Sequence, residues 1–337
     1  MISNERPDWQ AYLEGREEAT LFHDPRWGQM LAEVYPVRPW YITARDSRSI
    51  TGCLQLIEQR SVLFGSHLCS LPYFDSAGIL ADTEEAREEL IEAARMLRRD
   101  RRCKWVELRH EGISEEALPA RTDKMTLRLD LPEDSETLWT DLKAKVRNQV
   151  RKAQKAELKS QAGGAEMVDA FHRVYARNMR DLGSPPHSLR FFQRLLSTFP
   201  QSGRIFVIRH EGQPIAASLT LRDRHAVRVP WAGADWRFRN LNANMLLYWD
   251  MLAWSADNHG RYFDFGRSTI DAGTYRFKTQ WGAEPVQLVW QFLLPDGEDL
   301  PEVKPDSGAF KFLTACWTKL PLPLARWMGP RLISKLS

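Results

Sequence analysis

The stretch that decides the fold is Arg204-Ile-Phe-Val-Ile-Arg-His-Glu-Gly-Gln-Pro-Ile-Ala-Ala-Ser218. Residues 204–210 are rich in β-branched and aromatic side chains, and Glu211-Gly212-Gln213-Pro214 has the composition of a turn. A second apolar run follows at 215–221. The pattern predicts a β-hairpin, which a third strand at 226–231 extends.

After this hairpin, the spacing of the apolar residues changes to a period of about 3.6 residues, which is typical of a helix. The predicted elements are a helix at 242–258, a short strand at 262–265, a loop or helix start at 273–280 and a strand at 286–294. This order describes a mixed α/β fold and differs from a run of βαβ units with glycine-rich phosphate turns.

The segments before the hairpin predict helices, and the first half of the chain has a similar order of elements. A helix at 138–159 carries the apolar stripe Leu138, Leu142, Val146, Val150 and Ala153. In the first half, the predicted elements are a helix at 20–35, strands at 40–45 and 50–59, a helix at 82–99, and strands at 104–109 and 125–131. The repeated order predicts an internal duplication, with two domains of one fold in tandem.

Three regions follow from this organisation. We expect an N-terminal domain at 1–137, a C-terminal domain at 138–300 that the basic helix opens, and a tail at 301–337. The tail has five basic residues and no acidic residue from Ser307 onward. This composition suits either packing back on the first domain, which we favour, or contact with an anionic membrane surface.

The bulk composition excludes several classes of protein. The chain has 337 residues, 43% hydrophobic and 27% charged, with a formal net charge of +3, which is too small to indicate nucleic-acid binding by the whole chain. Cys53, Cys69, Cys103 and Cys316 form no CxxC pair, so we expect no metal site. The first residues lack the basic and apolar segments of a signal peptide, which favours the cytoplasm, with peripheral membrane contact as an option.

Several motifs in combination resemble those of the FemAB-like family of tandem GNAT acyltransferases and their BioF2-like relatives. The hairpin at 204–218, the segment Tyr262-Phe-Asp-Phe-Gly-Arg-Ser268 and the segment Gly273-Thr-Tyr-Arg-Phe-Lys-Thr-Gln-Trp-Gly282 carry the likeness, which covers about 140–294. The segment Met179-Arg-Asp-Leu-Gly-Ser-Pro-Pro-His187 is similar to the corresponding segment in a branch of this family that is associated with PEP-CTERM/exosortase and exopolysaccharide systems. The resemblance implies two GNAT-like domains and transfer of an acyl or aminoacyl group to an amine.

Such a transfer needs no nucleophile from the enzyme, because the amine attacks the activated carbonyl directly. The protein must align the substrates, accept a proton and stabilise the oxyanion. The resemblance places Lys278, in Tyr275-Arg276-Phe277-Lys278, at the centre of transfer, with Tyr275 and Arg276 binding substrate. Asp264 and Arg267 flank a glycine at a strand end, where Asp264 either orients Lys278 or Arg267 or holds an ion pair that pins the loop.

Two carboxylates in the first half of the chain are alternative candidates for the proton acceptor. Tyr73 and Asp75 lie in the distinctive loop Pro72-Tyr-Phe-Asp-Ser-Ala-Gly78, and Asp82 aligns better with the base of the family. Asp82 also makes a good helix N-cap in Asp82-Thr-Glu-Glu85, and we favour the cap.

Other side chains are predicted to bind substrate. The basic helix at 143–159 has seven Lys or Arg and one acidic residue, so Arg147 and Arg151 either contact phosphates, such as those of tRNA, or are solvated. His187, in a Pro-rich turn, either enters a cleft or packs on its neighbours, and Trp231 and Asn244 lie near the expected centre.

The donor defines the competing functions. Ordinary GNAT enzymes have a glycine-rich pyrophosphate loop, but the corresponding region Gly233-Ala-Asp-Trp-Arg-Phe-Arg-Asn-Leu-Asn-Ala-Asn244 lacks it. We therefore expect no bound cofactor, and a donor that is aminoacyl-tRNA or an acyl thioester, with an amine of a cell-envelope or exopolysaccharide precursor as acceptor. The alternatives are a CoA- or carrier-dependent GNAT N-acetyltransferase and a non-catalytic scaffold.

Overall fold

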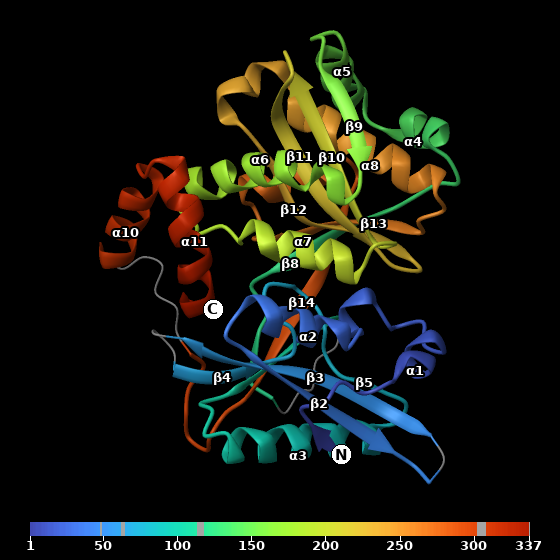
Figure 1. Ribbon diagram of the computed structural model, residues 1–337. Helices are drawn as coiled ribbons and strands as arrows, with labels where there is room; N and C mark the ends of the chain where they lie inside the picture. The colour runs from blue at the N-terminus through green and yellow to red at the C-terminus, as the bar shows by residue number, and fades with distance from the viewer. Residues whose placement is uncertain (48, 62–64, 113–117, 302–307, 337) are drawn as a thin grey trace. The chain divides into compact units, whose positions relative to one another are not determined.

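The computed structural model describes residues 1–47, 49–61, 65–112, 118–301 and 308–336 (Figure 1). Contacts divide the chain into two units. The first comprises Met1–Met125, Val286–Val303 and Ser334–Ser337, and the second comprises Thr126–Pro285 and Lys304–Ile333. Each unit is a mixed α/β domain, and each is described by itself.

The first domain contains a sheet of strand order β1-β2-β3-β4-β6-β14. The strands are β1 (Ile2–Ser3), β2 (Arg38–Arg45), β3 (Ile50–Ser61), β4 (Gly65–Cys69), β6 (Val106–Glu111) and β14 (Glu284–Leu293). Two short strands join it, β5 (Leu80–Ala81) on β3 and β7 (Ala120–Arg121) on β14. Strands β4 and β6 run parallel, whereas β2–β3, β3–β4 and β6–β14 are antiparallel.

Helices cover both faces of this sheet. Helix α3 (Glu84–Asp100) buries Leu90, Ala94 and Leu97 against one face, as its 3.6-residue apolar period requires. The N-terminal elements α1 (Gln10–Glu14), η1 (Leu21–His23) and α2 (Arg26–Val34) precede β2, and α2 contacts β2 and β3. Gly28 allows this close approach, because a Cβ there would lie 2.7 Å from the Cβ of Pro39.

The second domain contains the strand order β8-β13-β12-β11-β10-β9. The strands are β8 (Met125–Asp130), β9 (Lys159–Gly163), β10 (Gly203–His210), β11 (Gln213–Arg222), β12 (Ala226–Ala234) and β13 (Tyr262–Ser268). The predicted hairpin is confirmed, with β10 and β11 antiparallel from Gly203↔Leu221 to His210↔Gln213. Strands β12 and β13 are parallel, and α8 (Ala243–Asp257) connects them.

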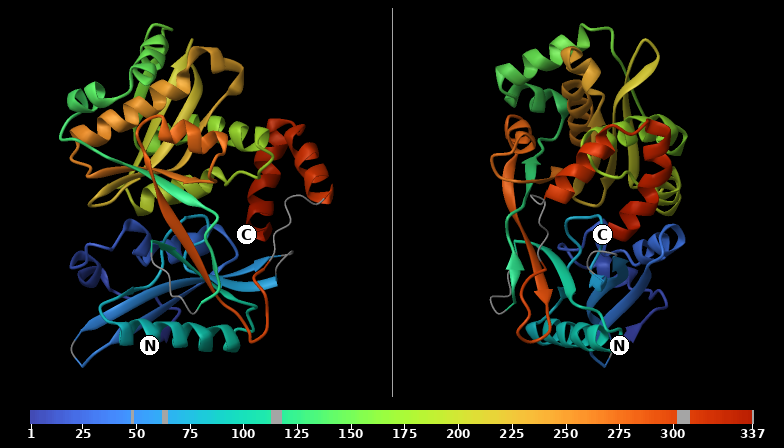
Figure 2. Two further views of the ribbon diagram at one scale, coloured as in Figure 1. Left: turned by 180° about the vertical axis from the view of Figure 1, so that it is seen from behind. Right: turned by 90° about the vertical axis from the view of Figure 1, so that its left-hand side faces the viewer.

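Two layers of helices enclose this second sheet. Helices α6 (Val168–Asp181) and α7 (Leu189–Thr198), preceded by η2 (Ala165–Met167), lie on the face toward the viewer in Figure 1. Helix α8 packs on the other face, and α4 (Ser135–Asp141) and α5 (Ala144–Gln154) contact α8, as the reverse view in Figure 2 shows. Short helices η3 (Trp236–Leu241) and α9 (Gly273–Thr279) flank α8 and β13 in sequence.

The predicted helix at 138–159, which includes the basic stretch 143–159, is wrong as a single element. Residues Leu142 and Lys143 are extended, with ψ of 143° and 139°, so that α4 ends before them and α5 begins after them. Lys159 starts β9, which pairs with β10 from Ile205↔Gly163 to Arg209↔Lys159. The pairing is a tertiary interaction, and it overrides the helical pattern of a segment whose side chains are mostly exposed.

The domain boundaries also differ from those expected. The division falls at Met125/Thr126 instead of 137/138, and most of β14 belongs to the first domain because it pairs with β6. The tail helices α10 (Gly308–Thr318) and α11 (Leu322–Leu336) are grouped with the second domain up to Ile333. The expected packing of the tail on the first domain stays a prediction. Residues 302–307 of the tail lie outside the described residues.

Candidate functional site

A pocket of about 460 Å³ opens in the second domain where β12 ends and α8 begins. Its volume is in the range of small-molecule sites, and its wall is mostly apolar with a few polar groups. The wall is formed by Asn178 and Leu182 of α6, residues 232–236 and 238–239 of β12 and η3, residues 242–245 and 248 of α8, and residues 273, 274, 277 and 278 of α9.

The N-terminal end of α8 forms one side of the pocket. Asn242 holds the left-handed conformation with φ of 55°, makes no side-chain cap, and is followed by a first turn without acidic residues. The N–H groups of Met245 and Leu246 bond to the Asn242 carbonyl at 2.9 and 3.3 Å. In the described part of the chain, the N–H groups of Ala243 and Asn244 have no hydrogen-bond partner. They can therefore bind an anionic or carbonyl oxygen in the pocket.

An asparagine replaces the missing glycine at this helix start. Asparagine tolerates positive φ better than other residues with a side chain. The connection from β12 to α8 is the 3-10 helix η3, in place of a glycine-rich loop. The absence of glycines therefore reflects a different backbone conformation before α8. It does not mean that the N–H groups at the start of α8 are blocked.

Asp235 fixes the floor of the pocket at the start of η3. Its buried carboxylate accepts a hydrogen bond from Arg237 Nε at 2.9 Å and lies 3.4 Å from Arg177 Nε of α6. Burial raises the pKa of Asp235, but the hydrogen bonds from Arg237 outweigh it and hold the pKa below the usual value. The charged group therefore ties α6 to η3 and keeps the two walls in place.

Lys278 on α9 reaches the pocket wall with a side chain that is only 7% exposed. Its Nζ donates to the carbonyl oxygens of Gly266 and Arg267 at 2.7 and 2.9 Å. The ammonium thus links α9 to the end of β13, beside the pocket. This position is compatible with a structural role and with a positive charge near a bound donor.

The pocket also contains an aromatic group that the sequence did not single out. Tyr248 lines the pocket, stacks on Phe265 at 5.6 Å and meets Phe277 edge-on at 4.9 Å. Burial raises the pKa of the Tyr248 phenol, so it stays protonated and can donate a hydrogen bond. Its spacing from Asn244 on one helix face was the available signal, since residues four apart are neighbours.

Asp264 contacts neither of its predicted partners. The carboxylate accepts from Thr126 Oγ1 at 2.5 Å and from Gly266 N at 2.8 Å, and it lies 3.8 Å from Arg228 Nε and 3.9 Å from Arg128 Nε. It therefore neutralises the buried Arg228 and the half-buried Arg128, and it fixes the turn at Gly266. These contacts favour the ion-pair interpretation, and Arg267 itself is exposed.

His187 and Trp231 belong to an aromatic cluster beneath α6 and α7. The His187 ring stacks on Phe191 at 4.3 Å and meets Trp231 edge-on at 5.9 Å, and both side chains are buried. Burial lowers the pKa of His187 to about 3, so the ring is neutral near pH 7. The packing interpretation of His187 is thus the one that its surroundings favour.

The two arginines of α5 that were predicted to bind phosphate contact residues of the neighbouring helix α4. Arg147 Nη1 donates to the carbonyl of Thr140 at 2.6 Å and closes the end of α4. Arg151 lies over the ring of Trp139 at 5.3 Å. Lys145, Lys152 and Lys155 are exposed.

Of the second-domain residues that the sequence predicted, the described pocket wall contains Asn244 and Lys278. Tyr275 is half-buried and packs against the core around α8, and Arg276 is exposed. One further carboxyl went unnoticed, that of Asp250 on α8, whose pKa burial raises to about 6. It lies toward Ser160 of β9 and outside the pocket wall.

The remaining candidates lie in the first domain. Tyr73 has a φ of 73°, an uncommon conformation for a residue with a side chain, and its ring lies 5.4 Å from that of Tyr35. The carbonyl of the next candidate, Asp75, accepts from Trp290 Nε1 at 3.0 Å. The loop is held further by Arg109, whose Nη1 donates to the Phe74 carbonyl at 2.5 Å.

The prediction that Asp82 caps α3 is wrong, because the cap is its neighbour. Thr83 Oγ1 accepts from Ala86 N at 3.2 Å. Asp82 instead pairs with Arg16, whose Nε lies 2.6 Å from Oδ1, and accepts from the Tyr12 hydroxyl at 2.9 Å. The hydrogen bond from Arg16 lowers the pKa of Asp82, which makes this carboxylate a weaker proton acceptor.

The comparison with protein families agrees with this geometry. Residues 141–279 match the model of the acetyltransferase (GNAT) domain family. This GNAT segment includes every pocket-lining residue. A search of curated proteins finds no match to the chain.

Solved structures extend the likeness to both domains. The chain is similar to the crystal structure of FemX, with a TM-score of 0.62 and 10% identity over 87% of this chain and 97% of that one. It is also similar to L-PGS from Bacillus licheniformis, with a TM-score of 0.57 and 11% identity over 99% of both chains. A tandem GNAT protein from the clavulanic acid biosynthesis pathway gives a TM-score of 0.52 and 11% identity over 79% and 85%. The predicted fold of two tandem GNAT-like domains is confirmed.

Proposed function

We propose that the protein is an N-acyltransferase that holds an activated acyl or aminoacyl donor in the pocket at the N-terminal end of α8. The observation that carries the proposal is this pocket, which lies inside the GNAT segment and presents two unpartnered backbone N–H groups. A donor oxygen that develops negative charge would find donors already oriented there. Such preorganised donors contribute about 3–4 kcal/mol each to transition-state stabilisation.

The chemistry assigns roles to the groups on the wall. The amine of the acceptor attacks the carbonyl carbon of the donor, and the leaving group departs with the bonding electrons. Tyr248 supplies a protonated hydroxyl for the leaving group or oxyanion, and Lys278 supplies positive charge. The acceptor's proton passes to water.

The donor is proposed to be aminoacyl-tRNA or an acyl thioester other than plain CoA. The η3 connection in place of a glycine-rich loop supports this choice, since it removes the usual cradle for a pyrophosphate. The exposed lysines of α5 would bind tRNA phosphates, whereas Arg147 is occupied by the end of α4. The acceptor is proposed to be an amine of a cell-envelope or exopolysaccharide precursor, on the strength of the FemAB-like motifs.

A second candidate is an ordinary CoA-dependent N-acetyltransferase. The family description of residues 141–279, which names an acetyltransferase, favours it. The free N–H groups of α8 would bind either kind of donor. A direct comparison of donors therefore decides between the two candidates, and a non-catalytic scaffold would bind none.

The test is thermal unfolding with acetyl-CoA or an aminoacyl-tRNA, in the wild-type protein and in two bulky variants of α9. Thr274 is exposed on the pocket wall, whereas Arg276 is exposed on the same helix outside it. We expect Thr274→Trp to lose protection by the donor and Arg276→Trp to keep it. At a ligand concentration of 100 Kd, protection amounts to about 2.7 kcal/mol.

Each outcome has a distinct meaning. Protection by acetyl-CoA alone would move the donor to the CoA class and leave the acyltransferase proposal intact. Protection that Thr274→Trp retains would place the donor outside this pocket. Absence of protection by both donors, with no transfer to a panel of amines, would contradict the proposed function.

A further inference from the structure

The two C-terminal helices, α10 and α11, have a surface that the proposed function does not use. They form a pair beside α6 in both Figure 1 and Figure 2. One face of the pair is fixed to the second domain, and the other face is exposed. The exposed face combines large apolar side chains with positive charge.

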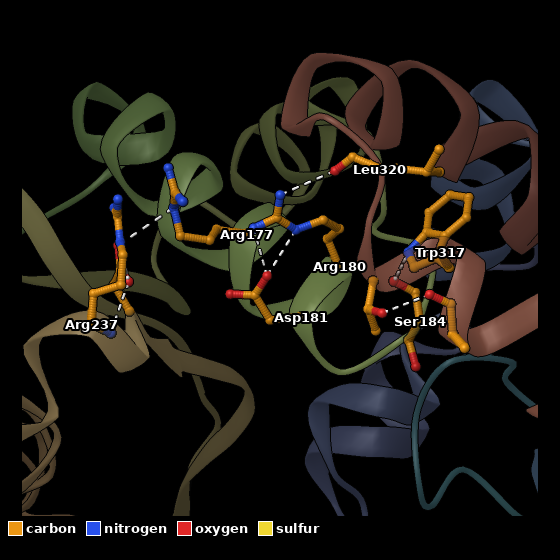
Figure 3. Close-up of polar contacts among 10 residues, drawn as sticks. Arg177, Arg180, Asp181, Ser184, Arg237, Trp317 and Leu320 are labelled. Carbon is orange, nitrogen blue, oxygen red and sulfur yellow. Dashed lines mark hydrogen bonds and ion pairs between the residues drawn. The ribbon is translucent and has the colours of Figure 1, made fainter.

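The inner face is held by specific contacts to the end of α6. Trp317 is 8% exposed, and its Nε1 donates to the Ser184 carbonyl at 3.0 Å; Arg180 Nη1 donates to the Leu320 carbonyl at 3.1 Å (Figure 3). On α11, a Cβ at Gly329 would lie 2.4 Å from the Cδ of Pro186. The pair is therefore anchored in one orientation, which determines the side chains that point outward.

The outer face is apolar at four large side chains. Phe312 and Leu313 on α10 are 69% and 65% exposed, and Trp327 and Leu324 on α11 are 60% and 39% exposed. Leu324 and Trp327 are three residues apart and so lie on one side of α11. Single exposed apolar residues are ordinary, but four on two adjacent helices indicate a binding surface.

The charge of the tail is one-sided. Between Ser307 and Ser337 there are five basic residues and no acidic residue, in a chain that has 47 basic and 44 acidic residues overall. Lys319 and Arg331 are exposed, and the guanidinium of Arg331 lies 4.5 Å above the ring of Trp327. An apolar ring with a cation beside it matches the boundary between acyl chains and head groups.

We propose that the outer face of α10 and α11 binds the surface of a bilayer that contains anionic phospholipids. Charge complementarity selects this partner, because Lys319 and Arg331 are exposed on the same two helices and the tail has no acidic residue from Ser307 onward. Among the described residues, no helix has the length and apolarity to cross a bilayer. The helices therefore lie in the interface plane, with Phe312, Leu313 and Trp327 inserted among the lipids.

The anchor has a consequence for the pocket, which rests on the proposed function. The last turns of α6 contribute Asn178 and Leu182 to the pocket wall, and the same turns hold the tail through Arg180. Docking of the tail thus fixes the pocket relative to the bilayer. The acceptor amine is then one that is carried at the membrane surface.

The experiment is sedimentation of the full chain with vesicles of phosphatidylcholine alone or of phosphatidylcholine mixed with phosphatidylglycerol. We expect binding to the mixed vesicles that weakens as salt increases, and little binding to phosphatidylcholine alone. Each cation near an anionic surface contributes about fivefold to partitioning, so Lys319→Glu/Arg331→Glu should weaken binding at least about 25-fold. Phe312→Ser/Trp327→Ser should weaken it by about tenfold or more.

Two controls keep the result specific. Lys145→Glu/Lys152→Glu reverses two exposed cations on α5, and Met96→Ser removes an exposed apolar side chain from α3. Both should bind as the wild type does. All changed side chains are exposed, and equal unfolding temperatures confirm that each variant is folded.

Several outcomes would overturn the proposal. These are no binding of the wild type, equal binding to both kinds of vesicle, or loss of binding in the α5 variant with retention in the tail variant. A concentration-dependent dimer that Trp327→Ser dissociates would assign the face to a second copy of the chain instead. Since none of these measurements uses catalysis, failure of the acyltransferase proposal is distinguishable from failure of this one.

Discussion

Helices α3 and α8 occupy corresponding places in the two domains, because each leads into a strand that runs parallel to an earlier one in its sheet. Their N-terminal ends are arranged differently. In α3, Thr83 caps the helix and Glu84 and Glu85 add negative charge to the first turn. In α8, Asn242 makes no side-chain cap and the first turn has no acid.

The difference has an electrostatic meaning. The start of a helix has a partial positive charge and unpartnered N–H groups, which an acidic side chain or an anionic ligand can satisfy. The first domain satisfies them with its own residues. The second domain leaves them open toward a pocket, which is the arrangement that a binding site requires.

The largest effect is expected where the pocket wall is fixed, at Lys278. Replacement by methionine keeps the length of the side chain but removes the ammonium that bonds to the Gly266 and Arg267 carbonyls. Hydrogen bonds from charged groups contribute about 1.5–3 kcal/mol each, so we expect Lys278→Met to lower the free energy of unfolding by about 2–4 kcal/mol. Urea or thermal unfolding of the variant and the wild type measures this change in the free energy of unfolding.

The exposed neighbour Arg276 supplies a matched control, since Arg276→Met changes the same helix without a buried bond. Lys278→Arg should retain part of the stability. If Lys278→Met were as stable as the wild type while transfer fell by orders of magnitude, the ammonium would be catalytic and its structural role would be refuted.

The next effect comes from making α8 resemble α3. Asn244→Glu places a carboxylate in the first turn and on the pocket wall. The helix should gain about 0.3–1 kcal/mol, whereas the affinity for an anionic donor should fall on the order of 10- to 100-fold by like-charge repulsion. Thermal unfolding with and without donor measures both quantities in one experiment.

Opposite signs for stability and binding are the distinctive result. Asn240→Glu adds the same charge to the exposed surface of η3, outside the pocket wall, and should leave donor binding nearly unchanged. Unchanged donor affinity in Asn244→Glu would show that no anionic group binds at the end of α8.

Much of the second domain could be predicted from sequence, because its signals are local. The two strands of the hairpin at 204–221 have high β propensity and a strong turn between them, and the structure confirms that they pair. The predictions that were wrong concern segments whose structure depends on tertiary contacts. Strand β9 is an exposed edge segment defined by its pairing with β10, and β14 joins the first domain through pairing with β6.

Only the residues of the candidate site that lie in local sequence motifs could be predicted. Asn244 and Lys278 were found through motifs, and both line the pocket. Tyr248 was missed, because an aromatic residue on an apolar helix has the same pattern whether it faces a core or a cavity. The partners of Asp264 come from β8 and β12, and no local pattern indicates them.

The smallest effect concerns Asp82, the acid that precedes the cap of α3. Its pKa is lowered mainly by the hydrogen bond with Arg16, so its contribution to stability is present above the ordinary value of 3.8 and is lost as the pH falls through the lowered value. The pair is partly exposed, with side chains 25% and 34% accessible, so Asp82→Asn should cost less than about 1 kcal/mol at pH 7. Unfolding temperatures of the variant and wild type should converge in strong acid. Arg16→Gln should give a similar loss, and the double variant should cost less than the sum of the two. Additive losses, or a difference that persists in strong acid, would mean that the ion pair does not stabilise the start of α3.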